Sequence, residues 1–308
     1  MTPSNGRMRL ANVTRGVIES PLRTLIYGTE GIGKTTWAAG APAPIFISAE
    51  KGTEMVDCAR YPEAQTWPDV FEALADLRSG AHEFQTVVID SLDWAEGLLW
   101  GFICRRDGKS HIEDYDYGKG YVVALGEWRR LLAEIEGLQS ARGTHVILVA
   151  HAILTNYPNP MGSNYDRYGL KLQDSKRASA AGLVKEWCQD ALFANYDDTT
   201  YKDGKQIKGI GTGARIVYTS HHAAYDAKNR HDLPEKLPLC FEDYFAAVKA
   251  RAPGDSKAIR EEIATLVKEI GDLDLAKKVK EYVNGGDDVS RLVKARDRLR
   301  AKLATKEG

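Results

Sequence analysis

Four short apolar runs are spaced along the first half of the chain, and each ends in a small or polar residue. They cover Thr24–Gly28, Pro44–Ala49, Thr86–Asp90 and His145–Ala150. Continuous apolar runs of this length are typical of parallel strands that are buried on both faces. Between the runs, apolar residues recur at helical spacing, which predicts helices over Asp69–Arg78, Asp93–Cys104 and Tyr121–Leu138. This alternation predicts an α/β fold with a mostly parallel sheet flanked by helices.

The pattern changes after Ala152. Residues 152–182 are polar, contain Gly, Pro, Asn and Tyr, and show no clear period. A connection of this length inside a compact domain is usually functional or mobile, so we expect a long loop. Two further strands are predicted over Asp190–Tyr196 and Ala214–Ser220. The Asp-Gly pair between them, Asp203 and Gly204, indicates a hairpin turn.

The last part of the chain is predicted to be helical. A helix over Phe241–Arg251 is followed by a break at residues 252–256, and two apolar stripes follow it. The stripes are Ile259, Ile263, Leu266, Val267 and Ile270, and then Val289, Leu292, Val293, Leu299 and Leu303. We therefore expect an N-terminal lead-in (residues 1–20), a core (residues 21–251) and a small C-terminal helical appendage (residues 252–308).

Composition narrows the class of protein. The 308 residues carry a formal net charge of −1, so no global field draws the chain to nucleic acid or to a membrane. The four cysteines lack the spacing of a zinc site, which favours buried free thiols in a reducing cytosol. Neither an apolar run of about 18 residues nor a signal-peptide pattern is present. We expect a cytoplasmic protein that makes no membrane contact.

A glycine-rich segment, GTEGIGKT, follows the first predicted strand and matches the P-loop pattern GxxxxGK[ST]. Glycines let the backbone N–H groups curl around phosphates, and the Lys34 ammonium adds a positive charge beside the β- and γ-phosphates. The Thr35 hydroxyl is expected to bind Mg²⁺. A chance glycine-rich turn is the alternative, but the strand-to-helix context favours a nucleotide site. Its expected residues are Gly28, Thr29, Glu30, Gly31, Ile32, Gly33, Lys34, Thr35 and Thr36.

Three polar side chains follow other predicted strands, where ligands bind in open α/β sheets. Asp90 is expected to hold Mg²⁺ with Thr35, although it could instead cap the next helix. Glu50 is expected to orient and deprotonate the attacking water, the alternative being a solvated surface glutamate. His151 is expected to sense the γ-phosphate, the alternative being a histidine satisfied at the edge of the core.

The segments GTEGIGKTT, FISAEKG, TVVIDS and VILVAH, in this order, resemble the RecA-like P-loop ATPases. In that group the catalytic glutamate follows the second strand, and the residue after Asp90 is Ser91 rather than Glu, which points to Glu50. Over roughly residues 20–245 the chain looks like the phage-encoded nucleotide-binding proteins of the Sak-four type, including GKGY (118–121) and AKNRHDLP (227–234). One departure is His151, which stands where recombinases often have an amide residue.

The resemblance implies a RecA-like P-loop NTPase core that uses ATP and Mg²⁺. It implies a ring or filament with nucleotide between protomers, in which Lys228 and Arg230 reach the neighbour's γ-phosphate; a solvated basic turn is the alternative. It also implies that the loop after His151 binds single-stranded DNA, a mobile polar lid being the alternative. Basic residues interleaved with aromatic ones suit that role. The candidates there are Arg167, Lys171, Lys176 and Arg177.

The residues predict a Mg²⁺-dependent ATPase. The resemblance implies that it is a phage protein that anneals or pairs single-stranded DNA as a head-to-tail oligomer in the host cytoplasm, with a single-strand-binding protein as a further partner. Two other functions remain open on the sequence. One is an AAA-type motor or helicase loader of phage replication, which would share the same core. The other is a nucleotide-gated DNA-binding module with little turnover.

Overall fold

The computed structural model of the protein describes residues 10–14, 18, 20–203, 206–250, 256–271, 279 and 289–304. The chain forms two compact units, Pro21–Val248 and a second unit that comprises Met1–Ser20 and Lys249–Gly308. The predicted three-part division at residues 20 and 251 stays a prediction. The larger unit holds the sheet and every residue predicted to act on nucleotide.

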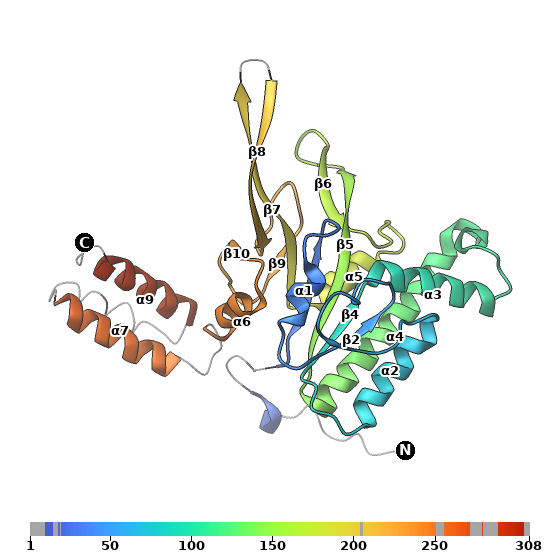
Figure 1. Ribbon diagram of the computed structural model, residues 1–308, viewed down its shortest axis with the longest axis horizontal. Helices are drawn as coiled ribbons and strands as arrows, with labels where there is room; N and C mark the ends of the chain where they lie inside the picture. The colour runs from blue at the N-terminus through green and yellow to red at the C-terminus, as the bar shows by residue number, and fades with distance from the viewer. Residues whose placement is uncertain are drawn as a thin grey trace. The chain divides into compact units, whose positions relative to one another are not determined.

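A ten-stranded mixed sheet runs through the larger unit, in the order β10-β8-β7-β1-β5-β4-β2-β3 with β6 on β5 and β9 on β7 (Figure 1). Neighbours among β7, β1, β5, β4, β2 and β3 are all parallel, whereas β8, β10, β6 and β9 pair antiparallel. The strands are β1 (Arg23–Gly28), β2 (Pro44–Ser48), β3 (Ala59–Arg60), β4 (Thr86–Asp90), β5 (His145–Tyr157), β6 (Tyr165–Leu170), β7 (Asp190–Asp203), β8 (Gln206–Tyr218), β9 (Lys228–Asn229) and β10 (Lys236–Pro238).

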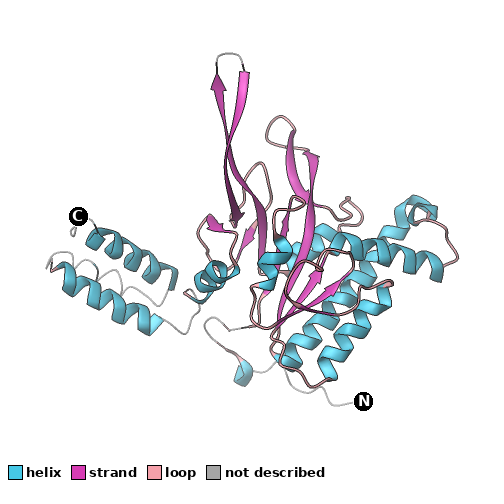
Figure 2. Cartoon of the chain, viewed as in Figure 1, coloured by secondary structure: helices cyan, strands magenta, loops and turns pink. Residues whose placement is uncertain are grey.

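Helices cover both faces of this sheet (Figure 2), because alternate residues of each parallel strand point to opposite faces. Leu25, Val87 and Leu148 pack with one set of helices, whereas Ile26 and Val88 pack on the other face. The first face is covered by α2 (Trp67–Ser79), α3 (Leu92–Arg106), α4 (Lys119–Arg142) and α5 (Ala180–Trp187), and the second by α1 (Lys34–Ala39) and α6 (Phe241–Lys249). The predicted α/β class with a mostly parallel, helix-flanked sheet is confirmed.

Short 3₁₀ turns lie at Leu10–Asn12, Ile112–Asp114 and Asp116–Gly118.

The expected long loop after Ala152 is wrong in its first half. Strand β5 continues to Tyr157 and turns back into β6, with Ala152 opposite Leu170 and Tyr157 opposite Tyr165. The sequence does not indicate this pairing, because the hairpin projects beyond the part of the sheet that helices cover. Ile153 and Leu154 are 43% and 58% exposed, so burial imposes no polar–apolar alternation on them.

A second hairpin is longer than the sequence predicts. Strands β7 and β8 pair from Phe193 opposite Tyr218 out to Asp203 opposite Gln206, with an irregularity between Tyr196 and Asp198. Figure 1 shows this hairpin extending past the other strands of the sheet. The predicted turn at Gly204 lies outside the described residues.

The second unit contains helices α7 (Ser256–Ile270) and α9 (Val289–Ala304), which pack against each other. Their interface includes Ile259, Ile263 and Leu266 of the first predicted stripe and Leu292 and Leu299 of the second. The side chains of Val289 and Val293 lie outside the described residues. The helical appendage expected from the sequence is therefore present.

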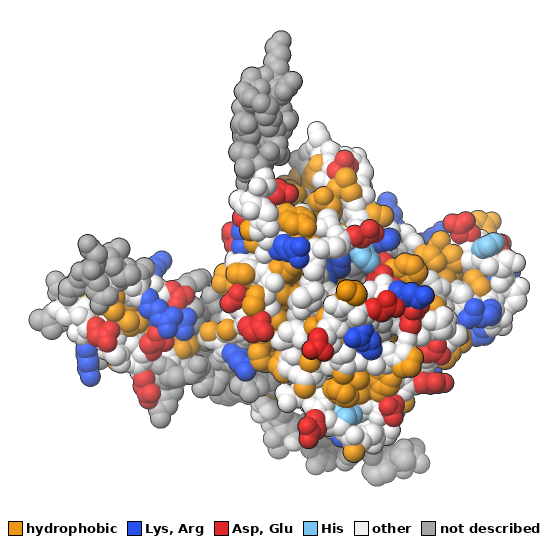
Figure 3. Space-filling view, in the orientation of Figure 1, with side chains coloured by type: hydrophobic (Ala, Val, Ile, Leu, Met, Phe, Trp, Pro, Cys, Tyr) orange, Lys and Arg blue, Asp and Glu red, His pale blue; other side chains and the backbone are white. Residues whose placement is uncertain are grey.

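Charge and cysteine placement agree in part with the expectations. Lys and Arg side chains are interspersed with Asp and Glu on the face of the larger unit seen in Figure 3, as the near-zero net charge suggests. All four cysteines are free thiols, but only Cys104 and Cys188 are buried; Cys58 and Cys240 are half-exposed. Among the described residues, the structure contains no helix with the length and hydropathy needed to cross a bilayer.

Candidate nucleotide-binding site

The carboxyl ends of the parallel strands meet at one edge of the sheet. Gly28, the last residue of β1, lies opposite His151 of β5, while Asp90 at the end of β4 lies opposite Val149 and Ser48. The P-loop and three other residues therefore follow strand ends that lie at the same level of the sheet. These residues are Asp90, Glu50 and His151. These strand ends therefore open onto a common edge of the sheet.

The P-loop connects the end of β1 to the start of α1, and its glycines are required by geometry. Gly33 has φ of 107°, a left-handed conformation that side chains rarely adopt. A Cβ on Gly28 would lie 2.1 Å from the carbonyl oxygen of Ala194, because β7 passes close by. The Lys34 Nζ donates hydrogen bonds to the carbonyls of Gly28 (3.1 Å) and Thr29 (2.9 Å). This folds the lysine back over the loop where a phosphate group would be held.

Thr35 and Asp90 come together as the sequence predicts. The Thr35 hydroxyl donates a hydrogen bond of 2.7 Å to Asp90 Oδ2. Burial raises the pKa of Asp90 to about 6, an effect opposed by the Thr35 hydrogen bond and enhanced by the negative charge of Glu50. A hydroxyl and a carboxylate side by side beside a phosphate loop suit Mg²⁺, which is usually held by one or two carboxylates with substrate phosphates and water. These residues fit the expected ion.

Glu50 lies at this edge and is half-buried. It follows Ala49, whose N–H donates to the carbonyl oxygen of Asp90 at 2.9 Å, so the chain after β2 is fastened to the end of β4. Its charge acts on both central groups, since it contributes to the raised pKa of Asp90. The pKa of Lys34 is lowered by burial, and Asp90, Asp93 and Glu50 oppose that shift. The placement agrees with the predicted role of Glu50, which stays a prediction.

His151 is joined to Asp93 in the first turn of α3. The His151 ring Nδ1 lies 3.0 Å from Asp93 Oδ2, and the His151 backbone N–H donates to Asp93 Oδ1 at 3.1 Å. Burial alone would raise the pKa of Asp93, but these hydrogen bonds outweigh it and lower the pKa. Lys171, just after β6, places its Nζ 3.8 Å from Asp93 Oδ2. The β5–β6 hairpin is thus linked to the strand edge through His151 and Asp93.

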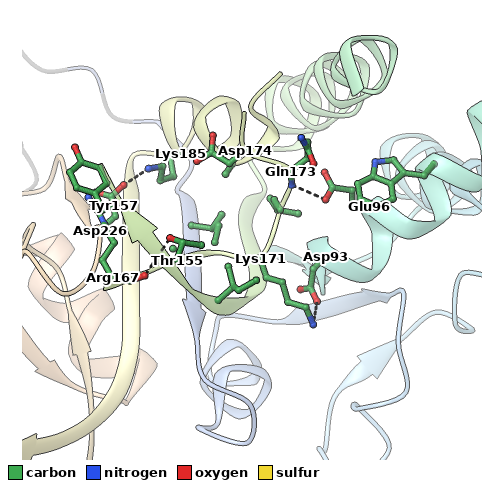
Figure 4. A pocket seen from close by; sticks show the side chains of 16 residues that line it. Asp93, Glu96, Thr155, Tyr157, Arg167, Lys171, Gln173, Asp174, Lys185 and Asp226 are labelled. Carbon is green, nitrogen blue, oxygen red and sulfur yellow. Dashed lines mark hydrogen bonds and ion pairs between the residues drawn. The ribbon is translucent and has the colours of Figure 1, made fainter. Parts of the chain in front are cut away.

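Behind this link lies a cavity of about 520 Å³ between α3, α5 and the β5–β6 hairpin (Figure 4). Its wall combines apolar side chains such as Trp100 and Ile153 with charges of both signs. The Glu96 carboxylate accepts a hydrogen bond of 2.9 Å from the Gln173 N–H. Burial raises the pKa of Glu96 to about 7. The charged residues lining the cavity are Asp93, Glu96, Arg167, Lys171, Asp174, Lys185 and Asp226.

The four candidates for DNA binding are placed differently from one another. Arg167 is 8% exposed, pairs with Asp226 at 3.4 Å and stacks on Tyr157, so its charge is already neutralised inside the protein. Lys171 is exposed beside Asp93, and Arg177 is exposed with its Nη1 donating to the Tyr117 carbonyl at 2.9 Å. Lys176 is exposed as well. The DNA role of these residues stays a prediction.

Lys228 and Arg230 do not join the P-loop of their own chain. They lie beside the start of β7, where Asn229 pairs with Asp190. This is the end of the sheet opposite to the carboxyl ends of the parallel strands. The Lys228 Nζ donates to the carbonyls of Lys185, Glu186 and Cys188, which uses all three of its N–H groups at the end of α5. The Arg230 side chain is exposed. Of the two, Arg230 is therefore the better placed to reach a neighbouring chain.

The sequence reasoning missed several residues near the site. Asp93 and Glu96 lie three positions apart on α3, a spacing that places two carboxylates on one helix face. This spacing was the available signal. Lys185 and Asp226 pair with each other across 41 residues, and no local pattern indicates that contact.

The chain is similar to several known proteins. A family model, AAA_24, described as an AAA domain, matches residues 20–231. The SPbeta prophage-derived uncharacterized protein YorG of Bacillus subtilis (strain 168) is 24% identical over 134 residues, which are 41% of this chain. The chain spans about 40% of the length of that curated relative. A crystal structure of the RadB recombinase aligns at 16% identity and a TM-score of 0.38, covering 71% of this chain and 86% of that one.

Proposed function

The chain belongs to the AAA domain family, and on that premise we propose that it is an ATP-hydrolysing phage recombination protein. It binds ATP with Mg²⁺ and acts on single-stranded DNA as a head-to-tail oligomer. The observation that carries the enzymatic part is the meeting of Lys34, Thr35 and Asp90 at one sheet edge, with Glu50 close enough to influence the charge state of two of them.

In this proposal the residues at the carboxyl ends of the strands have different roles in ATP hydrolysis. Backbone N–H groups of the P-loop and the Lys34 ammonium hold the phosphates. Thr35 and Asp90 would hold Mg²⁺, which would neutralise phosphate charge. Glu50 accepts a proton from water as the water oxygen attacks the γ-phosphorus. The bond from that phosphorus to the bridging oxygen breaks, and ADP and inorganic phosphate result. No covalent enzyme intermediate forms in this scheme.

Replacing Glu50 by Gln tests this assignment. Turnover should fall by about 10²–10⁴, since general base catalysis contributes that much, while ATP should still bind. Steady-state phosphate release and binding of a fluorescent ATP analogue measure the two effects separately. Glu54→Gln removes an exposed carboxylate four residues away and serves as the matched control. Full turnover in Glu50→Gln would reject the proposed base, and Lys34→Ala should lose hydrolysis and bind nucleotide weakly.

Assembly completes the site in this proposal, because Arg230 of one protomer reaches the γ-phosphate held by the next. A positive charge supplied in trans contributes on the order of 10³–10⁵ in rate. Arg230→Ala and Glu50→Gln should each be inactive alone but regain some activity when mixed, because some interfaces then hold two intact halves. Absence of rescue at every mixing ratio would contradict this arrangement.

Single-stranded DNA is proposed to bind near the β5–β6 hairpin and the segment after it. Exposed Lys171, Lys176 and Arg177 supply charge for the phosphates, and exposed Tyr157 and Leu154 supply apolar surface beside them. The link from Lys171 through Asp93 to His151 supports coupling between DNA and nucleotide. The proposal places the protein in the host cytoplasm with a single-strand-binding protein as a further partner.

DNA binding is tested with the pair Lys176→Ala and Arg177→Ala in one chain. Affinity for an oligonucleotide should fall and the dependence of log K on log salt should become shallower by roughly two units, one per lost phosphate contact. Arg129→Ala, which removes an exposed arginine on α4, is the control. Equal affinity of the variant and the wild type would reject the role of these two side chains. Absence of any wild-type complex with DNA at low salt, together with an ATPase rate that DNA leaves unchanged, would contradict the recombination function.

A further inference from the structure

Arg215 lies beside the P-loop of its own chain, although 182 residues separate it from Gly33 in the sequence. A Cβ placed on Gly33 would be 3.4 Å from the Arg215 Nη1. Gly33 immediately precedes Lys34 and caps α1, so it belongs to the part of the loop that surrounds phosphate groups. The guanidinium therefore lies within a few ångströms of the nucleotide site.

The backbone of Arg215 is fixed even though its side chain is exposed. Arg215 lies on β8 opposite Tyr196 of β7, and β7 is the direct neighbour of the P-loop strand β1. The Leu239 N–H donates to the Arg215 carbonyl at 3.0 Å, which fastens β8 on its other side. The Leu239 side chain also lies 3.6 Å from the same position on Gly33. The backbone of Arg215 is therefore held on both sides of β8, with the guanidinium beside the loop.

Within the described part of the chain, the Arg215 guanidinium has no carboxylate partner. Other arginines of the core, such as Arg23 and Arg78, are paired with glutamates at 3.0 Å. Guanidinium groups match the geometry of phosphate oxygens and form short, charge-assisted hydrogen bonds with them. An exposed, uncompensated arginine next to a P-loop is therefore suited to bind a phosphate group.

The side from which Arg215 approaches indicates which phosphate it meets. Asp90, Glu50 and His151 follow β4, β2 and β5, which all lie on one side of β1. These residues mark the γ-phosphate end in the proposed function. Arg215 comes from β8, on the other side of β1. The guanidinium therefore approaches the P-loop from the side opposite to the residues assigned to the γ-phosphate.

We propose that Arg215 binds the α- and β-phosphates, which ADP and ATP share, of the nucleotide held by its own chain. The inference rests on the proposed function, because it requires a nucleotide on the P-loop. It differs from the role given to Arg230, which acts on the γ-phosphate of a neighbouring chain. A cation on these phosphates contributes equally to ATP and ADP binding, because both nucleotides contain them.

The test compares Arg215→Ala, Arg215→Lys and wild type in binding of fluorescent ADP and of a non-hydrolysable ATP analogue. Arg215→Ala should weaken both nucleotides by the same factor, about 10–100-fold, as expected for loss of a charge-assisted hydrogen bond. Arg215→Lys should recover part of the loss because it keeps the charge. Lys236→Ala on β10, which removes a nearby exposed cation that pairs with Asp197, is the control and should bind both nucleotides as wild type does.

The outcomes separate the two proposals. If wild type binds neither nucleotide, the proposed function fails and this inference fails with it. If wild type binds and Arg215→Ala binds equally well, only the role of Arg215 is overturned. Loss of ATP-analogue binding with unchanged ADP binding also overturns it, because the contact would then be to the γ-phosphate. Circular dichroism of each variant verifies the fold, and Arg215→Gln replaces Arg215→Ala if the alanine variant does not fold.

Discussion

Glu96 is a carboxyl group buried between α3 and the segment that follows β6, and its ionisation should limit stability at neutral pH. Its side chain lines the cavity of Figure 4, and the residue is only 4% exposed. The Gln173 N–H donates to it at 2.9 Å, which favours the charged form. Burial is the larger effect and raises the pKa from 4.5 to about 7.

The size and sign of the effect follow from this shift. Below pH 4.5 the group is protonated in the folded and the unfolded chain, so it has no effect on the pH dependence. Between pH 4.5 and 7 the unfolded chain releases the proton while the folded chain keeps it, so stability is lost as pH rises. A shift of 2.5 units at about 1.4 kcal/mol each corresponds to about 3 kcal/mol, reached near pH 7.

Replacing Glu96 by Gln removes this titration while keeping an oxygen that can accept from Gln173. The free energy of unfolding, measured by urea titration at pH 5, 6, 7 and 8, should rise for the variant relative to wild type by about 2.5 kcal/mol across that range. Glu72→Gln replaces an exposed glutamate of α2 and should show no such trend. A constant difference between Glu96→Gln and wild type at all four pH values would refute the reasoning.

Two further predictions concern packing and buried polar contacts. Gly28→Ala should destabilise the fold by about 1–3 kcal/mol or more, because the new Cβ meets the Ala194 carbonyl oxygen at 2.1 Å. Gly97→Ala should instead stabilise the fold by about 0.5–1 kcal/mol, because Gly97 lies on an exposed turn of α3 with no atom within 4 Å of the new Cβ. Equal urea midpoints for the two variants would contradict this prediction. Asp190→Asn should cost about 2–3 kcal/mol, since the fully buried carboxylate accepts from the Arg230 N–H, the His231 ring and the Tyr244 hydroxyl. The exposed Asp243→Asn is its control in thermal unfolding, and a loss as small as that of the control would show that the three contacts contribute little.

Much of the fold could be predicted because its signals are local. Each parallel strand is buried on both faces, so its residues form a continuous apolar run that can be recognised without knowing its neighbours. The P-loop is likewise a single segment, and its glycines, lysine and threonine have fixed spacing because they wrap one phosphate group. The position of Asp90 and Glu50 at the same end of the sheet as the P-loop could be predicted because parallel strands end at a common edge.

The contacts and strand pairings that were not predicted are those in which a residue's partner is distant in the sequence. Exposed hairpins such as β5–β6 lack the alternation that burial imposes, so the strand beyond Ala152 was not predicted. The contacts of the Lys228 amine with carbonyls 40 or more residues away could not be predicted either, and its role at a neighbouring nucleotide stays a prediction. The sequence also gave no indication that the His151 ring is oriented by Asp93, 58 residues away.

The sequence by itself therefore determined the α/β class, the phosphate loop and the set of strand ends that bear charged groups. Only the tertiary structure decided which of those groups face one another, which cations are already neutralised and which remain available. Apolar periodicity and loop spacing depend on neighbouring residues, so they can be seen in one segment. Electrostatic pairing depends on distance in space, and the approach of Arg215 to Gly33 is created by strands β8, β7 and β1 lying side by side in the sheet.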